Sequence, residues 1–115
     1  MTGRILVAAF LLAHASTSAF AQSRPPRFWN LTKHTVKEFS LSKPGADQWG
    51  PNQCKNDKDG TVDVDERLRI TDTPPGDYDA RIVDVTGRAC FARGIRIAEG
   101  VIFSLEEKDL TGCRP

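Results

Sequence analysis

The chain has 115 residues, of which 27% are charged and 39% are hydrophobic, and its formal net charge at pH 7 is +1. This length predicts one small domain. Nucleic-acid-binding proteins usually carry a clustered surplus of basic residues, because neutralising phosphates supplies much of their affinity. The near balance of 16 basic and 15 acidic residues therefore argues against a nucleic-acid partner.

The first 21 residues have the pattern of an export signal. Arg4 is followed by an apolar run over residues 5–13, and the sequence Ala19-Phe20-Ala21 matches the small-x-small site after which signal peptidase cuts. The apolar run is shorter than the roughly 20 residues that cross a bilayer, so we expect no membrane span after cleavage. The pattern predicts that residues 1–21 are a signal peptide and that the protein is periplasmic or secreted.

The rest of the chain reads as short strands separated by turn signals. Residues 22–27 contain two prolines and are expected to form an extended leader. Alternating or bounded apolar stretches then predict strands at residues 28–31, 36–42, 67–71, 88–97 and 101–105, with a bulge at Gly94. A further strand follows the corner Pro74-Pro75-Gly76, with Tyr78, Ala80 and Ile82 on one face.

This spacing of strands and turns is typical of an all-β domain. We predict a small antiparallel β-sandwich over residues 28–115, immunoglobulin-like or prealbumin-like. No stretch of helical periodicity long enough for a stable helix interrupts it. Residues 106–110 could form one helical turn or a simple tail.

Trp49 lies in a stretch without periodicity, residues 46–54, and has two interpretations. A plug packed over one end of the sandwich is favoured, because tryptophan is the largest apolar side chain and no second exposed aromatic residue can be placed beside it. The alternative is a platform on which a sugar or another aromatic ligand stacks, which makes Trp49 a candidate binding residue. Trp29, in the first predicted strand, is expected in the core.

Three cysteines, Cys54, Cys90 and Cys113, follow the predicted signal peptide. Exported proteins meet an oxidising compartment, and one disulfide in a domain of this size contributes about 3 to 4 kcal/mol in the chain-entropy model. Three pairings are possible, and sequence alone does not choose between them. We favour Cys54 with Cys113, which ties the long loop to the C-terminal tail. Cys90, in a predicted strand, is then a buried thiol that acts as a small hydrophobe.

Residues 55–66 match the twelve-residue calcium loop at most of its positions. The predicted ligands come from the side chains of Asp57, Asp59, Asp63 and Glu66 and the carbonyl of Thr61. Lys55 stands at the first position, where an ammonium opposes a cation. The competing interpretation, a hairpin that turns at Asp59-Gly60, is favoured. We therefore expect no cofactor, with calcium as the alternative.

The sequence lacks the arrangements that are typical of enzymes. It has no Ser-His-Asp order, no glycine-rich phosphate loop and no Cys/His metal spacing, and His34 is the only histidine after residue 21. Aspartate and glutamate are frequent, but acids this common are usually solubilising surface residues. The sequence predicts a protein without catalytic activity.

Four segments carry a resemblance to known proteins: residues 49–54 (Trp-Gly-Pro-Asn-Gln-Cys), 66–70, 75–79 (Pro-Gly-Asp-Tyr-Asp) and 84–88. They resemble a group of small, exported, uncharacterised bacterial proteins that share a Trp-Gly-Pro-Asp/Asn-Gln segment and a Pro-Gly-x-Tyr-Asp strand. More loosely, the Pro-Pro-Gly-x-Tyr rhythm is similar to carboxypeptidase-regulatory-like and immunoglobulin-like modules. The resemblance implies export and a sandwich fold, and it brings no catalytic residues.

These observations favour a protein that acts by binding another macromolecule, such as an envelope or extracellular protein. Contact is expected at edge strands or at the loops around Trp49. Two alternatives stay open: a calcium-dependent binding module that uses residues 55–66, and an inhibitor of an exported hydrolase. The inhibitor hypothesis fits the size and the disulfide but points to no residue of its own.

Overall fold

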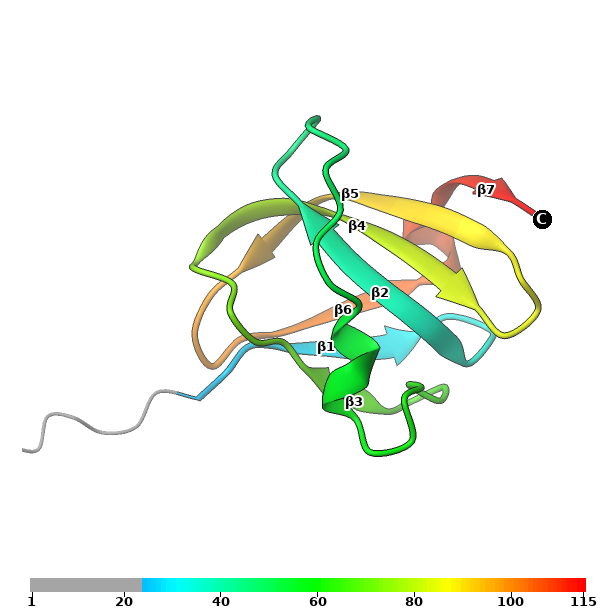
Figure 1. The fold of residues 1–115 in the computed structure, drawn as a ribbon, viewed down its shortest axis with the longest axis horizontal. Helices are drawn as coiled ribbons and strands as arrows, with labels where there is room; N and C mark the ends of the chain where they lie inside the picture. Colours follow the sequence, from blue (N-terminus) through cyan, green and yellow to red (C-terminus); the bar gives the residue numbers. More distant parts are fainter. Residues whose placement is uncertain (1–23) are drawn as a thin grey trace, which may run out of the picture.

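The computed structural model describes residues 24–115, in which seven strands form two packed sheets (Figure 1). One sheet has the strand order β3-β1-β6 and the other the order β2-β4-β5-β7. The predicted all-β sandwich is confirmed. The predicted signal peptide, residues 1–21, and the first two residues of the predicted leader lie outside the described residues. The strands are β1 (Arg27–Leu31), β2 (Val36–Ser42), β3 (Arg67–Arg69), β4 (Gly76–Asp84), β5 (Ala89–Ile97), β6 (Ile102–Glu106) and β7 (Thr111–Arg114).

Strand pairing is antiparallel except between β1 and β6, which run parallel. The predicted bulge at Gly94 is confirmed, because Tyr78 pairs with Ile95 whereas Ala80 pairs with Ala92, which leaves one residue of β4 opposite two of β5. Gly94 has a φ of +71°, a conformation that glycine adopts without strain. Within residues 24–115 no helix has the length and hydropathy that a membrane crossing requires.

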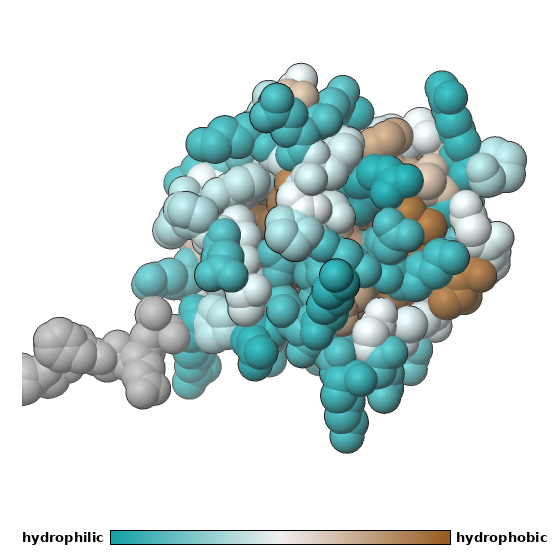
Figure 2. Space-filling model, viewed as in Figure 1, coloured by the Kyte–Doolittle hydropathy of each residue, from teal (hydrophilic) through white to brown (hydrophobic). Residues whose placement is uncertain are grey.

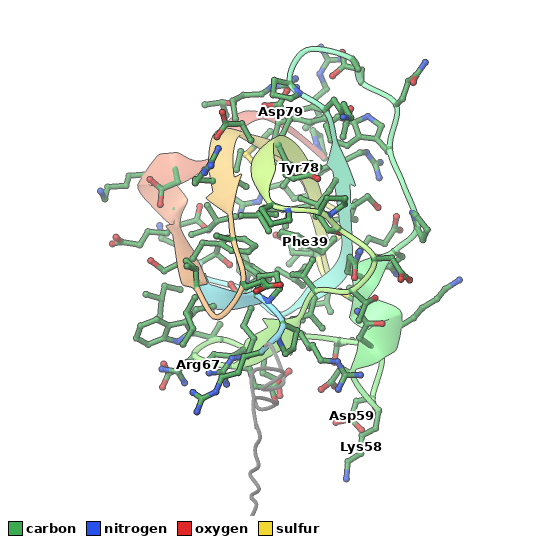
Figure 3. All side chains as sticks on the ribbon, turned by 90° about the vertical axis from the view of Figure 1, so that its left-hand side faces the viewer. Phe39, Lys58, Asp59, Arg67, Tyr78 and Asp79 are labelled. Carbon is green, nitrogen blue, oxygen red and sulfur yellow. A yellow bond between two sulfur atoms is a disulfide. The ribbon has the colours of Figure 1, made fainter. Side chains whose placement is uncertain are left out.

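Three phenylalanines join the two sheets at the centre of the core. Phe28 of β1 and Phe39 of β2 are fully buried, and their ring centroids lie 4.4 Å apart. Phe103 of β6 packs beside both rings. Figure 3 shows Phe39 in the space between the two layers. Trp29 does not join this core as expected: it is half-buried, and it faces outward because its neighbour Phe28 takes the inward position.

The predicted Pro-Pro-Gly corner leads into β4 and is held by a tyrosine. The hydroxyl of Tyr78 donates a hydrogen bond of 2.6 Å to the carbonyl oxygen of Pro74. Ala80 and Ile82, which share the inward face with Tyr78, are buried in the core as predicted. A tyrosine that bonds the backbone a few residues upstream in this way fixes the angle at which the chain enters a sandwich.

A segment that we call the strap, residues 50–56, covers the edges of both sheets and contains the short 3-10 helix η2 (Gln53–Asn56). The side chain of Asn52 accepts from the backbone N–H of Phe39 and donates to the carbonyl of Lys37, so it replaces a neighbouring strand along β2. Gln53 binds both the N–H and the carbonyl of Thr71, just beyond β3. Polar side chains of the strap therefore satisfy strand edges that would otherwise stay open.

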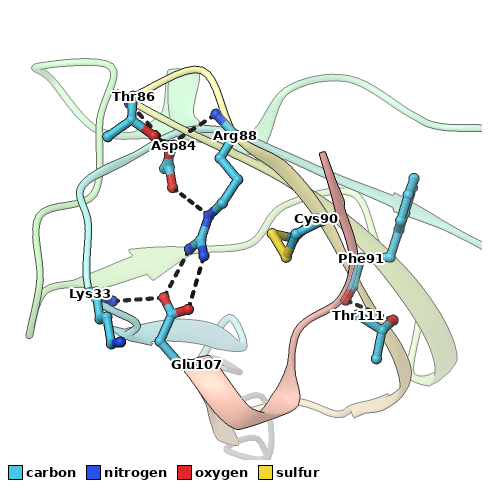
Figure 4. Close-up of a disulfide and its surroundings, with 9 residues drawn as sticks. Lys33, Asp84, Thr86, Arg88, Cys90, Phe91, Glu107 and Thr111 are labelled. Atoms are coloured by element: carbon cyan, nitrogen blue, oxygen red, sulfur yellow. Dashed lines mark hydrogen bonds and ion pairs between the residues drawn. A yellow bond between two sulfur atoms is a disulfide. The ribbon is translucent and has the colours of Figure 1, made fainter. Parts of the chain in front are cut away.

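The predicted disulfide is wrong in one partner: Cys113 is bonded to Cys90, not to Cys54 (Figure 4). The sheet order explains the difference. Cys113 lies in β7, which pairs with β5, and β5 carries Cys90. Cys54 lies in the strap beside β2, at the opposite edge of this sheet, where its thiol faces the carbonyl of Val36. Cys54 is fully buried, and burial raises the pKa of its thiol to about 12.

Candidate binding site

The loop of residues 43–49 stands above the four-stranded sheet and carries Trp49 (Figure 1). Hydrogen bonds to neighbouring strands fix it. The N–H of Gln48 donates to the hydroxyl of Ser42, and the N–H of Gly45 donates to the buried carboxylate of Asp79 on β4. Beyond Trp49, the N–H of Gly50 donates to the carbonyl of Leu41. The position of Trp49 is therefore set by bonds on both sides of it.

The ring of Trp49 lies against the ring of Phe91, with centroids 5.6 Å apart and planes inclined by 32°. Phe91 points outward from β5, because Cys90 and Ala92 on either side of it point into the core. Both aromatic residues are half-buried. The expectation that no second aromatic residue could lie beside Trp49 is wrong, since strand β5 brings Phe91 to it from a distant part of the sequence.

Arg93, also on β5, completes the cluster. Its Cζ lies 4.7 Å from the ring centroid of Phe91 and 6.0 Å from that of Trp49, within the range of cation–π attraction. Its Nη1 is held by carboxylate oxygens of Asp79 at 3.0 Å and Asp47 at 3.1 Å. Two acids thus hold the guanidinium beside the rings.

Asp79 is the buried anchor of this arrangement. Burial opposes the ionisation of its carboxyl group, but hydrogen bonds from the N–H groups of Gly45 and Gly94 and from Arg93 outweigh that cost and lower its pKa. The carboxylate therefore stays charged at neutral pH. It ties the loop of Trp49 to the bulge of β5, and through Arg93 to the two rings.

We call Trp49, Phe91 and Arg93 the Trp49 surface. Trp49 packs against the domain, as the plug interpretation expects. It covers the outer face of a sheet, however, and not one end of the sandwich. Part of both rings stays accessible. Such a surface can contact flat apolar groups and donate hydrogen bonds, and it contains no nucleophile or general base. The alternation along β5 could have indicated that Phe91 and Arg93 share the outward face, but not that Trp49 joins them.

A groove of about 420 Å³ lies between the strap and the corner at residues 71–74. Polar groups that line it already bond one another: the side chain of Asn56 donates to Gln53 and to the carbonyl of Arg69. Figure 2 shows this side of the molecule, on which hydrophilic side chains predominate. These polar groups of the groove are therefore already satisfied within the chain.

The acidic side chains of residues 55–66 bind local donors. The carboxylate of Asp57 accepts from the N–H of Asp59, and that of Glu66 accepts from the N–H of Asp63. The carboxylate of Asp63 accepts from the hydroxyl of Thr35. Three of the four predicted acidic ligands are thereby turned toward N–H or O–H groups, which compete with a cation for their oxygens.

The chain turns at Asp59-Gly60 as predicted, but the predicted hairpin does not form, because in the described residues the segments on either side of this turn do not pair with each other. Gly60 turns the chain with a φ of +75°, and Val62, next to the predicted carbonyl ligand Thr61, pairs with Val36 in an isolated bridge. Lys58 and Asp59 project from the molecule at the tip (Figure 3). In the part of the chain that the structure describes, no three His, Cys, Asp or Glu side chains are placed to hold a metal ion.

Addition of millimolar Ca²⁺ is expected to change the melting temperature by less than about 1 °C. A site with a Kd a hundredfold below the calcium concentration would add about 2.7 kcal/mol to the free energy of unfolding. Thermal unfolding in 5 mM CaCl2, 5 mM MgCl2 and EDTA measures the difference. A rise in Ca²⁺ alone that disappears in Asp63→Asn would show that the acidic residues do hold the ion.

A second charged cluster lies at the end of the sandwich that carries the β4–β5 and β1–β2 turns (Figure 4). The guanidinium of Arg88 forms two hydrogen bonds with Glu107, at 2.9 and 3.0 Å, and one with Asp84 at 3.1 Å. The carboxylate of Glu107, at the start of the 3-10 helix η3 (Glu107–Asp109), also accepts from the N–H of Lys33. The cluster joins the β4–β5 turn, the β1–β2 turn and η3, so its role is structural.

Replacing Glu107 with glutamine is expected to lower the free energy of unfolding by about 1 to 2 kcal/mol at pH 7, the value of a charge-assisted pair that is partly exposed. The bonds from Arg88 lower the pKa of Glu107 to about 2. A lowered folded-state pKa gives stability that is complete above the unfolded value near 4.5 and is lost as the pH falls toward 2.

Urea unfolding of the parent and of Glu107→Gln between pH 7 and pH 2 measures this loss. The difference between the two proteins should be constant above about pH 5 and should shrink below pH 4.5. Glu99→Gln, at an exposed glutamate, is the matched control. A difference that does not depend on pH would show that the charge of Glu107 is not what stabilises this end.

Comparison of the chain with protein-family models, with curated proteins and with solved structures found no match.

Proposed function

We propose that this is an exported, non-catalytic β-sandwich protein that acts by binding another macromolecule, an envelope or extracellular protein, through the Trp49 surface. The observation that carries the proposal is the fixed, half-exposed ring of Trp49 against Phe91, with Arg93 anchored beside both. Tryptophan and arginine are the residue types that most often dominate protein–protein binding energy. Anchoring before contact lowers the entropy lost on binding.

Three buried or partly buried carboxyl groups and one buried thiol have the pKa shifts of structural residues. At Asp79 and Asp84, burial raises the pKa of the carboxyl group, but hydrogen bonds to the carboxylate outweigh this effect and lower the pKa. The pKa of Glu107 falls to about 2 and that of Cys54 rises to about 12. Catalytic acids and bases usually have pKa values displaced toward neutrality, whereas these four are displaced away from it.

Capture from envelope extract tests the proposal. The immobilised parent protein should retain a partner that Trp49→Ala and Phe91→Ala lose, and truncation of a binding hot spot should weaken affinity by about 30-fold or more. Val85→Ser, at a side chain that is 52% exposed in the β4–β5 turn, is the matched control and should retain the partner. If the partner is a hydrolase, its activity in the presence of the protein tests the inhibitor alternative.

Recovery of the same proteins by the parent and by Trp49→Ala would contradict the proposal, provided both are folded by circular dichroism. Recovery of no partner from the envelope or from the medium would contradict it as well.

A further inference from the structure

The outer face of the β3-β1-β6 sheet carries an arginine-rich surface on the opposite side of the molecule from the Trp49 surface. Its side chains point outward because Phe28, Leu68 and Leu105 of the same strands are buried. Figure 3 shows Arg67 on the outside of one layer and Asp79 on that of the other, with Phe39 between them. The strand register places two rows on this face: Arg69, Arg27 and Ile102, then Arg67, Trp29 and Ser104.

The arginines of this face are exposed, and no carboxylate of the described part of the chain pairs with them. Arg27 and Arg69 stand directly opposite each other on paired strands, an arrangement that destabilises a sheet through like-charge repulsion. Within residues 24–115, neither of them nor Arg67 forms an ion pair. On the other sheet Arg81, Arg93 and Arg96 each have a carboxylate oxygen within 3.4 Å. The repulsive pair therefore indicates a site for an anion that comes from outside the chain.

Trp29 lies between these arginines, but its ring is already engaged. The Cζ of Arg67 lies 4.2 Å from the ring centroid, and the indole N–H donates to the carboxylate of Asp65 at 3.0 Å. A base or a sugar that stacked on this side of the ring would have to displace the guanidinium. That argues against nucleic acid or carbohydrate as the ligand, since both depend on open aromatic faces.

Exposed aliphatic side chains adjoin the arginines. Ile102, in the row of Arg27, is 39% exposed, and Val101, whose carbonyl accepts from the N–H of Arg27, is 42% exposed. Leu31 is half-buried at the other end of β1. A soluble polyanion gives such side chains nothing to contact, whereas a lipid surface offers anionic headgroups and, just below them, an apolar layer.

The carboxylates around this face do not neutralise the pair of Arg27 and Arg69. Asp65 is bonded to Trp29, and Glu66 accepts from the N–H of Asp63. Glu106, at the Leu31 end of the sheet, is paired with Lys108. Glu99, in the turn before Val101, and Asp72, just beyond β3, lie at the Arg27 end of the face, and within residues 24–115 neither forms an ion pair with Arg27 or Arg69. The basic end of the face is thus the end formed by Arg27, Arg69 and Ile102.

We propose that this arginine face, made of Arg27, Arg67, Arg69, Trp29 and Ile102, docks on a membrane surface that contains anionic phospholipid. The guanidinium groups bind lipid phosphates, and Ile102, Val101 and the indole of Trp29 lie at the headgroup boundary, where tryptophan is enriched. The protein rests on the membrane and does not cross it. The two surfaces lie on opposite faces, so the Trp49 surface stays free for its partner.

Vesicle co-sedimentation tests this inference with the protein as it is recovered after export, its N-terminus read by mass spectrometry. The parent should bind vesicles of 70% phosphatidylcholine and 30% phosphatidylglycerol and should show little binding to phosphatidylcholine alone. Each arginine near an anionic surface contributes about fivefold to binding, so Arg27→Gln/Arg69→Gln should bind about 30-fold more weakly. Ile102→Ser should also weaken binding, and 0.5 M salt should release the parent.

The double variant Arg81→Gln/Arg96→Gln makes the same change in charge on the other sheet and should bind within about twofold of the parent. Melting temperatures separate binding from folding: removing the repulsion of Arg27 and Arg69 should leave stability unchanged or raise it. Equal vesicle binding by the parent and Arg27→Gln/Arg69→Gln would overturn the inference. So would a lowered melting temperature in that variant, or binding to dextran sulfate without binding to the vesicles.

Discussion

Replacing Phe39 with alanine is expected to cost about 3 to 5 kcal/mol of the free energy of unfolding. Phe39 is fully buried, and it is the residue through which β2 reaches Phe28 of the opposite sheet, at 4.4 Å between ring centroids. Domains of this size have a total stability of roughly 5 to 15 kcal/mol, so the variant is expected to lose a large share of its stability and to unfold at a much lower urea concentration than the parent. Urea unfolding followed by circular dichroism measures the loss.

A milder series keeps this prediction measurable. Phe39→Leu and Phe28→Leu should each cost less than the alanine change, because a leucine leaves a smaller cavity. Their double variant should lose about 1 kcal/mol less than the sum of the two single losses, because each single variant already removes the same contact between the two rings. Val85→Ala, at an exposed position, should stay within about 0.5 kcal/mol of the parent. A loss below about 1 kcal/mol for Phe39→Ala would show that the rings do not hold the sheets together.

Strands whose own residues alternate could be predicted from the sequence. The stretch 36–42 places Phe39 and Leu41 on one face, and the structure has a strand with the same bounds. The strand after the Pro-Pro-Gly corner was predicted in the same way, with Ala80 and Ile82 inward. Such strands can be recognised from neighbouring residues alone, because the alternation of apolar and polar side chains shows which face of the strand is buried.

Features that depend on distant partners could not be predicted. β7 has four exposed residues without alternation, so only its pairing with β5 makes it a strand. The hairpin predicted at Asp59-Gly60 does not form, because the segment after this turn meets β2 instead, at the single residue pair Val36 with Val62. The contact of Trp49 with Phe91 has the same origin. Side chains far apart in sequence meet only after the strand order is set.

The segment Trp-Gly-Pro-Asn-Gln-Cys shows how a motif can suggest function when most of its residues serve the fold. Asn52 and Gln53 replace strand partners at the edges of the two sheets, and the side chain of Cys54 is buried between the strap and β2. Trp49, at the start of the segment, keeps accessible surface and lies against Phe91 over a sheet. The candidate site is therefore the aromatic position of the motif, whose ring the fold buries only in part.

Loss of the Cys90–Cys113 disulfide is expected to lower the free energy of unfolding by about 3 kcal/mol. The bond joins residues separated by 23 positions, and the chain-entropy model gives about 3 kcal/mol for a loop of this length. Cys113→Ser, Cys90→Ser and the parent in reducing agent should all melt lower, by roughly 12 to 24 °C at 4 to 8 °C per kcal/mol. Differential scanning calorimetry with and without reductant measures the shift.

Cys54→Ala is the control that separates the two pairings. It leaves the disulfide intact and removes one buried sulfur, so it should cost only about 1 kcal/mol. Reductant should destabilise Cys54→Ala as much as it destabilises the parent, and it should have no effect on Cys113→Ser. If Cys54 were bonded to Cys113, Cys54→Ala would match Cys113→Ser instead. Alkylation adds a second readout: the native protein should expose no reactive thiol, because Cys54 is buried, and the denatured protein should expose one, at Cys54.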